Sequence, residues 1–170
     1  KVVTASAALE EGAATLNSSY NCTGSVMVPG WPRPIHCHDH SGHGLQSFTE
    51  AVVNSCNPAF IAIGNSLGAD RFFKYFDAFG LTEKTGIDLP AEAQNSYYTA
   101  EQLNAVSLAS CSFGQSNTVT PIQMLTAAAA VVNGGKLLPP HIVSKVLDSV
   151  GKFAVETGTG VRRQVICEEN

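Results

Sequence analysis

Charged residues are scarce in this chain of 170 residues, where Asp, Glu, Lys and Arg make up 14% against about 25% in an average soluble protein. Hydrophobic residues make up 44%, so the composition excludes a disordered chain and supplies enough apolar surface for a core. No run of Lys or Arg is present and the net charge is −4, which argues against nucleic acid as a partner. No apolar stretch approaches the ~20 residues that span a bilayer, so we expect the chain itself to be soluble.

Apolar spacing typical of helices predicts a mainly helical region over residues 1–140. The first helix is expected to run from residue 1 to Gly12, and because it begins without a capping residue we expect the chain to be a fragment that starts inside a helix. The last helix is apolar nearly all round and is therefore predicted to be buried. The other helices are expected at residues 48–54, 58–67, 69–79, 100–110 and 121–133, the last being the apolar one.

The stretch from residue 13 to residue 47 shows no sustained periodicity and carries Gly, Pro and four of the five histidines. We predict a long ordered loop here, and a loop of this length in a compact domain is usually functional. After His141 the pattern changes to strands over 142–147, 153–156 and 161–166, separated by turns at 149–151 and 158–160. With no internal repeat and no linker, residues 1–170 are predicted to be a single domain, truncated at both ends.

Several short motifs follow one another in a specific order. On its own, Ser55-Cys56-Asn57 is a weak signal that also fits turn chemistry at the start of a helix. Together with its neighbours, however, it resembles the transpeptidase domain of class B penicillin-binding proteins, which cross-link bacterial peptidoglycan. The cysteine inside this motif is most similar to the division and sporulation-related branch. The resemblance covers roughly residues 1–143 and is carried by the blocks 43–51, 54–60, 85–92, 112–117, 119–124 and 133–135.

The resemblance implies a mixed α and β fold similar to serine β-lactamases and DD-peptidases, with a helical cluster on a partial antiparallel sheet. It also implies three catalytic elements. In the first, Ser-x-x-Lys, Lys1 matches the lysine that activates the serine when it is partly desolvated, and the serine lies before Lys1. In the second, Ser55 relays a proton toward the leaving amine, while Asn57 orients the lysine and binds the substrate amide.

The third element of the family is a Lys-Thr-Gly triplet on a strand at the edge of the site. A literal Lys84-Thr85-Gly86 occurs 27 residues after Asn57, but no strand pattern surrounds it. The segment 157–160 has the sequence Thr-Gly-Thr-Gly without a preceding lysine and is predicted to be a hairpin turn. We reject both, expect the catalytic strand beyond Asn170, and therefore expect this fragment to be inactive.

For the parent protein the resemblance implies a serine-type D-Ala-D-Ala transpeptidase that works through an acyl-enzyme. Its partners would be peptidoglycan stem peptides, β-lactam antibiotics that mimic them, and division or sporulation proteins. No metal or organic cofactor is required, and the parent would be anchored in the bacterial membrane with this domain outside. The alternatives are a non-catalytic binding or scaffold module, and a β-lactamase or β-lactam sensor on the same fold.

The histidine-rich stretch offers a zinc site as an alternative to the prediction of no metal. His36, His38 and His40 would share one side of an extended segment, with Cys37 beside them. Against this, no Cys-x-x-Cys pair exists, and His43 is better explained as the family's His-Gly step before a helix.

The chain has five cysteines, an odd number that does not fix the redox compartment. Cys37 and Cys56 are a candidate redox pair, because a bond between them would tie the long loop across the floor of the site. The alternative is small buried thiols that fill core space.

Two further predictions concern other side chains. Asp88 and Glu92 are expected to be solvated loop charges, and the aromatic residues between 72 and 79 are expected to belong to the core.

Overall fold

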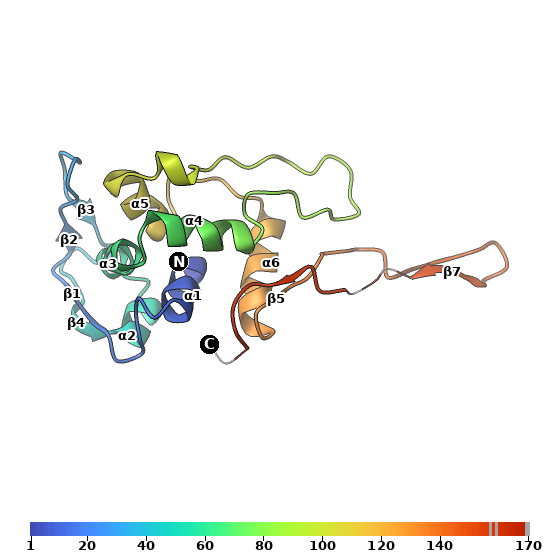
Figure 1. Ribbon diagram of the computed structural model, residues 1–170, viewed down its shortest axis with the longest axis horizontal. Helices are drawn as coiled ribbons and strands as arrows, with labels where there is room; N and C mark the ends of the chain where they lie inside the picture. Colours follow the sequence, from blue (N-terminus) through green and yellow to red (C-terminus); the bar gives the residue numbers. More distant parts are fainter. Residues whose placement is uncertain (157, 159, 169–170) are drawn as a thin grey trace.

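The computed structural model describes residues 1–156, 158 and 160–168. Its helices gather into one body, with α1 and α4 between the pair α3–α5 on one side and α6 on the other (Figure 1). Among the described residues, no helix is long and apolar enough to cross a membrane. The helices are α1 (Val2–Glu10), α2 (Phe48–Val53), α3 (Asn57–Leu67), α4 (Ala69–Ala78), the 3-10 helix η1 (Ala100–Gln102), α5 (Ala105–Ser112) and α6 (Pro121–Val132).

Local sequence signals set these helix boundaries. Ser47 and Glu50 form a reciprocal capping box at the start of α2, in which the Ser47 side chain accepts from the Glu50 N–H and the Glu50 carboxylate accepts from the Ser47 N–H. Thr120 and Gln123 do the same for α6. Gly12, with a φ of +63°, follows the end of α1. The helices predicted from spacing are therefore confirmed to within a few residues, and the stretch at 100–110 divides into η1 and α5.

Small residues allow the central helices to approach closely. Ala7 and Ala8 on α1 are completely buried, and α1 packs against α3, α4 and α6. Gly64 on α3 faces Ser112 on α5, so that a Cβ added at Gly64 would lie 1.8 Å from the Ser112 hydroxyl oxygen. The Thr4 hydroxyl then donates to the Ser112 carbonyl at 2.9 Å, which joins α1 to the same contact.

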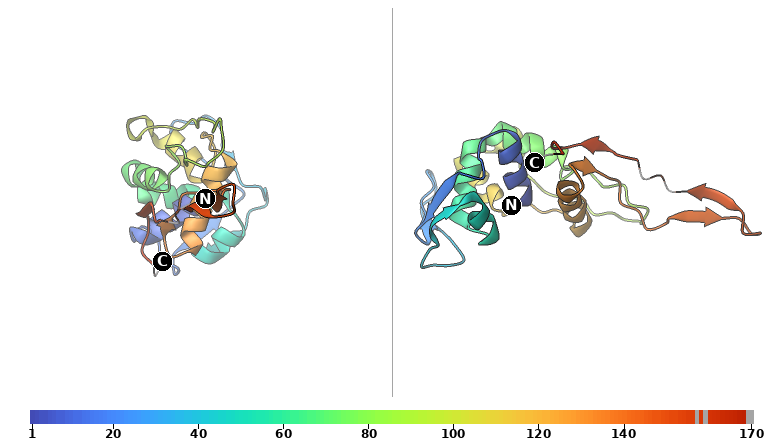
Figure 2. Two further views of the ribbon diagram at one scale, coloured as in Figure 1. Left: turned by 90° about the vertical axis from the view of Figure 1, so that its right-hand side faces the viewer. Right: turned by 90° about the horizontal axis from the view of Figure 1, so that it is seen from below.

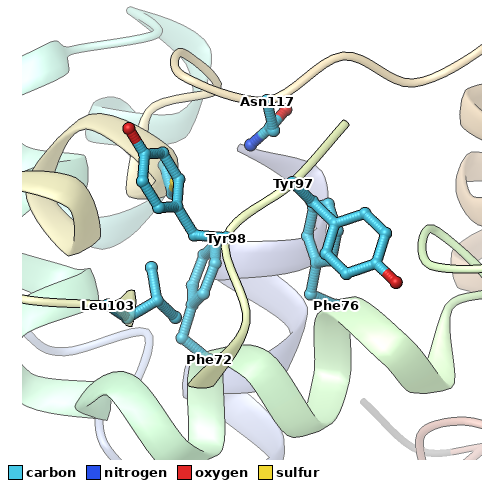
Figure 3. A pocket seen from close by; sticks show the side chains of 7 residues that line it. Phe72, Phe76, Tyr97, Tyr98, Leu103 and Asn117 are labelled. Atoms are coloured by element: carbon cyan, nitrogen blue, oxygen red, sulfur yellow. The ribbon is translucent and has the colours of Figure 1, made fainter. Parts of the chain in front are cut away.

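The aromatic side chains of α4 form much of one hydrophobic core cluster. Phe72, Tyr75, Phe76 and, just after the helix, Phe79 are buried, and the partly buried Phe73 packs against them, so these aromatic residues belong to the core as predicted. Figure 3 shows Phe72 and Phe76 facing the tyrosines at 97 and 98 and the leucine at 103, which come from the segment leading into and following η1. This packing fixes the segment against α4.

Eight short strands pair in four separate two-stranded antiparallel sheets among the described residues. Two of the pairs are nested inside the stretch predicted to be a loop: β1 (Ser19–Cys22) with β4 (Gly44–Ser47), and β2 (Ser25–Val26) with β3 (Ile35–His36). Strands of two to four residues are too short to show an alternating pattern, so they could not be predicted from periodicity. A Cβ at Gly24 would lie 2.0 Å from the His40 carbonyl oxygen, which shows how tightly the nested pairs fold back.

The C-terminal strands are β5 (Lys136–Leu137) with β8 (Arg163–Gln164), and β6 (Lys145–Leu147) with β7 (Phe153–Glu156). β7 has the predicted bounds and β6 and β8 are shorter than predicted, whereas β5 lies where no strand was predicted. The β6–β7 hairpin projects away from the helical body (Figures 1 and 2), with the predicted turn at 149–151 between its strands. Of the predicted turn at 158–160 and the Thr-Gly-Thr-Gly segment, residues 157 and 159 lie outside the described residues.

The prediction that α6 is buried is wrong. Leu125 is 63% exposed and Val132 is 86% exposed. One face of α6 borders an open apolar groove of about 390 Å³ that is also lined by residues of α1 and α2. Apolar composition shows only that a helix face prefers burial. Within the described residues, nothing packs over the exposed face of α6.

Asp88 and Glu92 lie in a loop, as predicted, with Asp88 exposed and Glu92 half-buried, but both carboxylates also accept hydrogen bonds from the backbone. The Asp88 carboxylate accepts hydrogen bonds from the N–H groups of Ile142 and Val143, both at 2.8 Å. Glu92 accepts from the N–H and the hydroxyl of Thr85, both at 2.7 Å. The Thr85 region is loop rather than strand, as predicted, and these carboxylates hold it in place.

Replacing Gly64 by alanine tests the close contact between α3 and α5. Although alanine favours a helix by about 1 kcal/mol, the added methyl would overlap Ser112, so we expect a net loss of about 1–3 kcal/mol in the free energy of unfolding. Urea denaturation measures this loss. The exposed Ser66→Ala on the same helix is the control, expected to change stability by less than about 0.5 kcal/mol. Adding Ser112→Gly to the Gly64→Ala variant should recover part of the loss, and a full loss in that double variant would contradict the clash.

Candidate active site

The structure brings together the three residues predicted to be catalytic. The Lys1 ammonium nitrogen, Nζ, donates to the Ser55 hydroxyl at 2.8 Å, to the Ser55 carbonyl oxygen at 2.6 Å and to Asn57 Oδ1 at 2.7 Å. Lys1 and the Ser55–Asn57 turn are more than fifty residues apart in the chain. The cluster therefore depends on the packing of α1 against α3, which the close contacts described above maintain.

The turn that carries Ser55 is a tight link between α2 and α3. Ser55 has a φ of +48°, a left-handed conformation that costs a residue other than glycine about 1–3 kcal/mol. The Cys56 N–H donates to the Ala51 carbonyl at 3.0 Å, and the Cys56 side chain is completely buried. Asn57 Nδ2 donates to the His36 carbonyl at 3.1 Å, so the turn is also tied to β3. These contacts hold Ser55 and Asn57 toward Lys1.

Burial lowers the pKa of the Lys1 side chain below its ordinary value, while the nearby Cys37 and Cys56 thiols act in the opposite direction. The Lys1 nitrogen also lies 5.5 Å from the centre of the Phe60 ring. A lysine in these surroundings loses its proton more readily than one in water. The site thus contains an amine that is prepared for proton transfer.

The hydrogen bonds show what this amine can do. All three N–H groups of the charged form are used by Ser55 and Asn57. After loss of a proton, the neutral amine keeps two donors and gains a lone pair that can accept a proton from a nearby hydroxyl. The Ser55 hydroxyl, which is exposed, can then pass a proton between Lys1 and a group bound at the surface.

The residues named as an alternative zinc set are not brought together around one point. His36 stacks on His40 with ring centroids 5.2 Å apart, and both are exposed, as is His38. Cys37 instead lies among Cys22, His43 and Cys56, whose ligand atoms are all within 4.8 Å of one another. The pairing of β1 with β4 and of β2 with β3 brings these four residues together, and neither pairing is evident from the sequence pattern.

The two cysteines of the candidate redox pair lie side by side as thiols. Their Sγ atoms are 4.0 Å apart, compared with about 2.05 Å in a disulfide. Burial raises the pKa of the Cys56 thiol, whereas hydrogen bonds from the backbone of His43 and Gly24 outweigh burial and lower that of Cys22. A bond between Cys37 and Cys56 remains a prediction.

A family model, the penicillin binding protein transpeptidase domain, matches residues 1–168. The chain belongs to this family. Stage V sporulation protein D of Bacillus subtilis (strain 168) is 40% identical over 171 residues, which cover 99% of this chain and 26% of that protein. The peptidoglycan D,D-transpeptidase MrdA of Acinetobacter baumannii is 30% identical over 129 residues, covering 71% of this chain and 19% of that protein.

Solved transpeptidase structures share the fold of this family member. Penicillin-binding protein A from Mycobacterium tuberculosis, solved as a ceftriaxone acyl-enzyme complex, has a TM-score of 0.87 and 25% sequence identity. The match covers 99% of this chain and 38% of that chain. The predicted family and the mixed α and β fold are thereby confirmed. The chain spans about a quarter of the length of the curated relatives it matches most fully.

Replacing Asn57 by aspartate tests the electrostatics of Lys1 in the candidate active site. The new carboxylate would lie about where Asn57 Oδ1 now accepts from Lys1 at 2.7 Å, and an opposite charge this close raises a lysine pKa by roughly 1–3 units. A titration of the Lys1 side chain followed by NMR, in a polypeptide extended at its N-terminus by the natural sequence, measures the change. Asn54→Asp, on the same turn but bonded to Gln46, is the control. An unchanged Lys1 pKa in Asn57→Asp would contradict the geometry.

Proposed function

We propose that this chain is part of a serine-type peptidoglycan D,D-transpeptidase in which Lys1 is the general base. Membership of the transpeptidase family supports the reaction class, and MrdA, a relative, is itself named a peptidoglycan D,D-transpeptidase. The observation that carries the proposal is the contact of one partly buried lysine nitrogen with both Ser55 and Asn57. This arrangement of amine, hydroxyl and amide suits acyl transfer.

In the proposed first half-reaction, a serine three residues before Lys1 attacks the carbonyl carbon of the penultimate D-Ala in a stem peptide. Position i and position i+3 lie on one helix face, so Lys1 can take the proton from the serine hydroxyl. Ser55 passes a proton to the nitrogen of the terminal D-Ala, whose bond to the carbonyl breaks as that residue leaves. The product is an ester between the serine and the shortened stem peptide.

In the second half-reaction, an amine from a neighbouring stem peptide attacks the ester carbon. The amine loses its proton through Ser55 to Lys1, the ester bond breaks, and the serine oxygen recovers a proton. Asn57 holds the lysine and offers its amide to the substrate backbone throughout. The net result is one new peptide bond and one free D-Ala, with the enzyme regenerated.

The proposed partners follow from this chemistry. A β-lactam would acylate the same serine, since its ring amide resembles the D-Ala-D-Ala bond, and penicillin-binding protein A is solved as such an acyl-enzyme with ceftriaxone. The likeness to stage V sporulation protein D supports a role in sporulation or division, with partners drawn from those processes. For the parent we propose a membrane anchor and an extracytoplasmic position for this domain. The chain itself lacks the serine and the Lys-Thr-Gly strand and is proposed to be inactive alone.

The decisive experiment is the intact mass of a longer polypeptide before and after excess penicillin. It should carry the natural sequence on both sides, including the serine and the Lys-Thr-Gly strand. We expect one covalent adduct per chain, absent when the serine is replaced by alanine. Absence of an adduct on the folded protein would refute acyl transfer and leave a binding module, whereas rapid loss of the adduct would indicate a β-lactamase.

Two variants separate the roles of the site residues. Lys1→Gln should slow acylation by roughly 10²–10⁴-fold, because general base catalysis typically contributes that much. Ser55→Ala should slow the reaction as well, since no hydroxyl remains to relay the proton. Lys145→Gln, on the exposed strand β6, is the matched control and should acylate at the normal rate. A normal rate in Lys1→Gln would remove Lys1 from the mechanism.

A further inference from the structure

The loop between β2 and β3, residues 27–34, displays the only tryptophan of the chain. Trp31 is 49% exposed, although tryptophan side chains are on average highly buried. Within the part of the chain that the structure describes, its ring stacks on no other ring or cation and its indole N–H has no acceptor. An exposed aromatic ring without a partner in its own chain is suited to contact another molecule.

A tight turn holds the backbone of this tryptophan in place. The Trp31 N–H donates to the Val28 carbonyl at 3.0 Å, which closes a turn with Pro29 and Gly30 at its centre. Gly30 has a φ of +87°, and proline followed by such a glycine is the sequence that a type II turn favours. Val28 itself is 4% exposed and belongs to a hydrophobic core cluster. Because two of the three residues after Trp31 are prolines as well, the loop is rigid and binding would order little additional chain.

The loop leads directly into the candidate active site. It continues into β3, where the His36 carbonyl accepts from Asn57 Nδ2 at 3.1 Å. Five residues of extended chain reach at most about 18 Å, so Trp31 lies within that distance of the backbone that holds Asn57. Figure 1 shows the loop projecting beyond β2 and β3. A ligand that extends a few residues beyond Lys1 and Asn57 covers a comparable distance.

We propose that Trp31 binds a sugar ring of the peptidoglycan glycan strand whose stem peptide reacts in the active site. The proposal rests on the proposed function for the choice of peptidoglycan as the substrate. In peptidoglycan each stem peptide is attached to an N-acetylated sugar, so a short peptide separates the sugar from the reacting end. This separation agrees with a sugar contact that lies outside the cluster of Lys1 and Asn57.

The groups around Trp31 suit a sugar. One face of a pyranose ring carries C–H groups that stack on an aromatic ring, while its hydroxyl and acetamido groups remain polar. The indole N–H can donate to one of these oxygens. The guanidinium of Arg33 is exposed and makes no ion pair or hydrogen bond among the described residues, so it can donate to others. The loop thus offers an apolar face beside several donors, and it contains no acidic residue.

Two other kinds of partner fit the loop less well. Residues 29–32 form a Pro-x-x-Pro pattern, which some domains bind as a polyproline II helix, but the φ of +87° at Gly30 interrupts such a helix. A stable protein interface covers about 800 Å² on each partner, whereas Met27 and Trp31 are the large exposed apolar side chains of this loop. A single ring is small for such an interface and sufficient for one sugar.

Contact at Trp31 would turn delivery of the stem peptide into an intramolecular step. Once the sugar is bound, the reacting D-Ala is confined near the active site, which raises its effective concentration there. We therefore expect stem peptides that carry their glycan to bind more tightly than free stem peptides.

The test follows Trp31 directly by fluorine NMR. A polypeptide with the natural sequence on both sides is labelled with 5-fluorotryptophan, and the Trp31 signal is identified by its absence in Trp31→Phe. Separate titrations use peptidoglycan glycan without its stem peptides, chitotetraose, which has the same N-acetylated kind of sugar, and the free stem peptide. We expect a saturable shift of the Trp31 signal with both glycans and no shift with the stem peptide.

Matched variants separate the role of the ring from that of the fold. Trp31→Ala should weaken co-sedimentation with insoluble, peptide-free peptidoglycan glycan by about tenfold or more, the loss typical of a central aromatic contact. Trp31→Tyr should retain most of the binding, because the phenol ring offers a similar face. Leu16→Ala removes another apolar side chain, which is 65% exposed and lies outside the loop, and should bind normally. Both positions are exposed, so we expect all three variants to fold.

Three results would overturn the proposal. One is a Trp31 signal that shifts with neither glycan. Another is an equal shift with the free stem peptide or with cellotetraose, which lacks the acetamido groups, because the N-acetylated glycan would then not be what the ring recognises. The third is a shift that follows protein concentration or added lipid vesicles instead of glycan, which would assign the ring to a second copy or to a membrane.

The outcome for Trp31 is independent of the outcome for the acyl-enzyme. Glycan binding without a penicillin adduct would uphold this site and refute the proposed acyl transfer. An adduct without glycan binding would refute this site alone.

Discussion

The contact between Lys1 and the Ser55–Asn57 turn is the interaction on which the candidate active site depends. It joins the start of α1 to the start of α3 across more than fifty residues of sequence. The lysine side chain does not hold those two helices together by itself, since partly exposed polar contacts each contribute little. The small side chains of Ala7 and Ala8, which have no exposed surface, instead allow α1 to pack closely. Gly64 allows α3 to approach Ser112 on α5, and the Ser112 carbonyl in turn accepts from Thr4 on α1. The chemistry of the site is thus a consequence of packing between small residues some distance from it.

The same turn also combines strain with support. Ser55 adopts a conformation that non-glycine residues avoid, and strained residues persist where their surroundings determine the conformation. Here Asn57 is tied to the backbone of β3, Cys56 is completely buried, and the nested strand pairs lie beneath. The histidine-rich segment, which from sequence is a loop without regular structure, is therefore the floor that supports the turn. The buried side chains of Cys22, Cys37 and Cys56 lie within this floor.

Local signals determined what could be predicted from the sequence. Apolar spacing along the chain predicted helices at 48–54, 58–67 and 121–133, which the structure confirms to within a few residues. What failed depended on contacts between distant segments. The two-residue strands β2 and β3 have no pattern of their own, and the exposure of Val132 depends on what packs over α6 rather than on its composition. Likewise, the group of Cys22, Cys37, His43 and Cys56 depends on the register of β1 against β4, so the histidines nearest to Cys37 in sequence were chosen in place of Cys22 and His43.

Two motifs show that a sequence match alone does not identify a catalytic site and that the geometry of the residues decides. Lys84-Thr85-Gly86 matches a catalytic triplet letter for letter, yet it lies in a loop where Glu92 accepts from both the N–H and the hydroxyl of Thr85. Those groups are already used to hold the loop, so they are not available to a substrate. Ser55-Cys56-Asn57 is a much weaker pattern, common at helix starts. It nevertheless directs a hydroxyl and an amide at the same amine, on a turn whose conformation is fixed from several sides. A short motif therefore supports a catalytic role only when its polar atoms remain free to meet one another and a ligand.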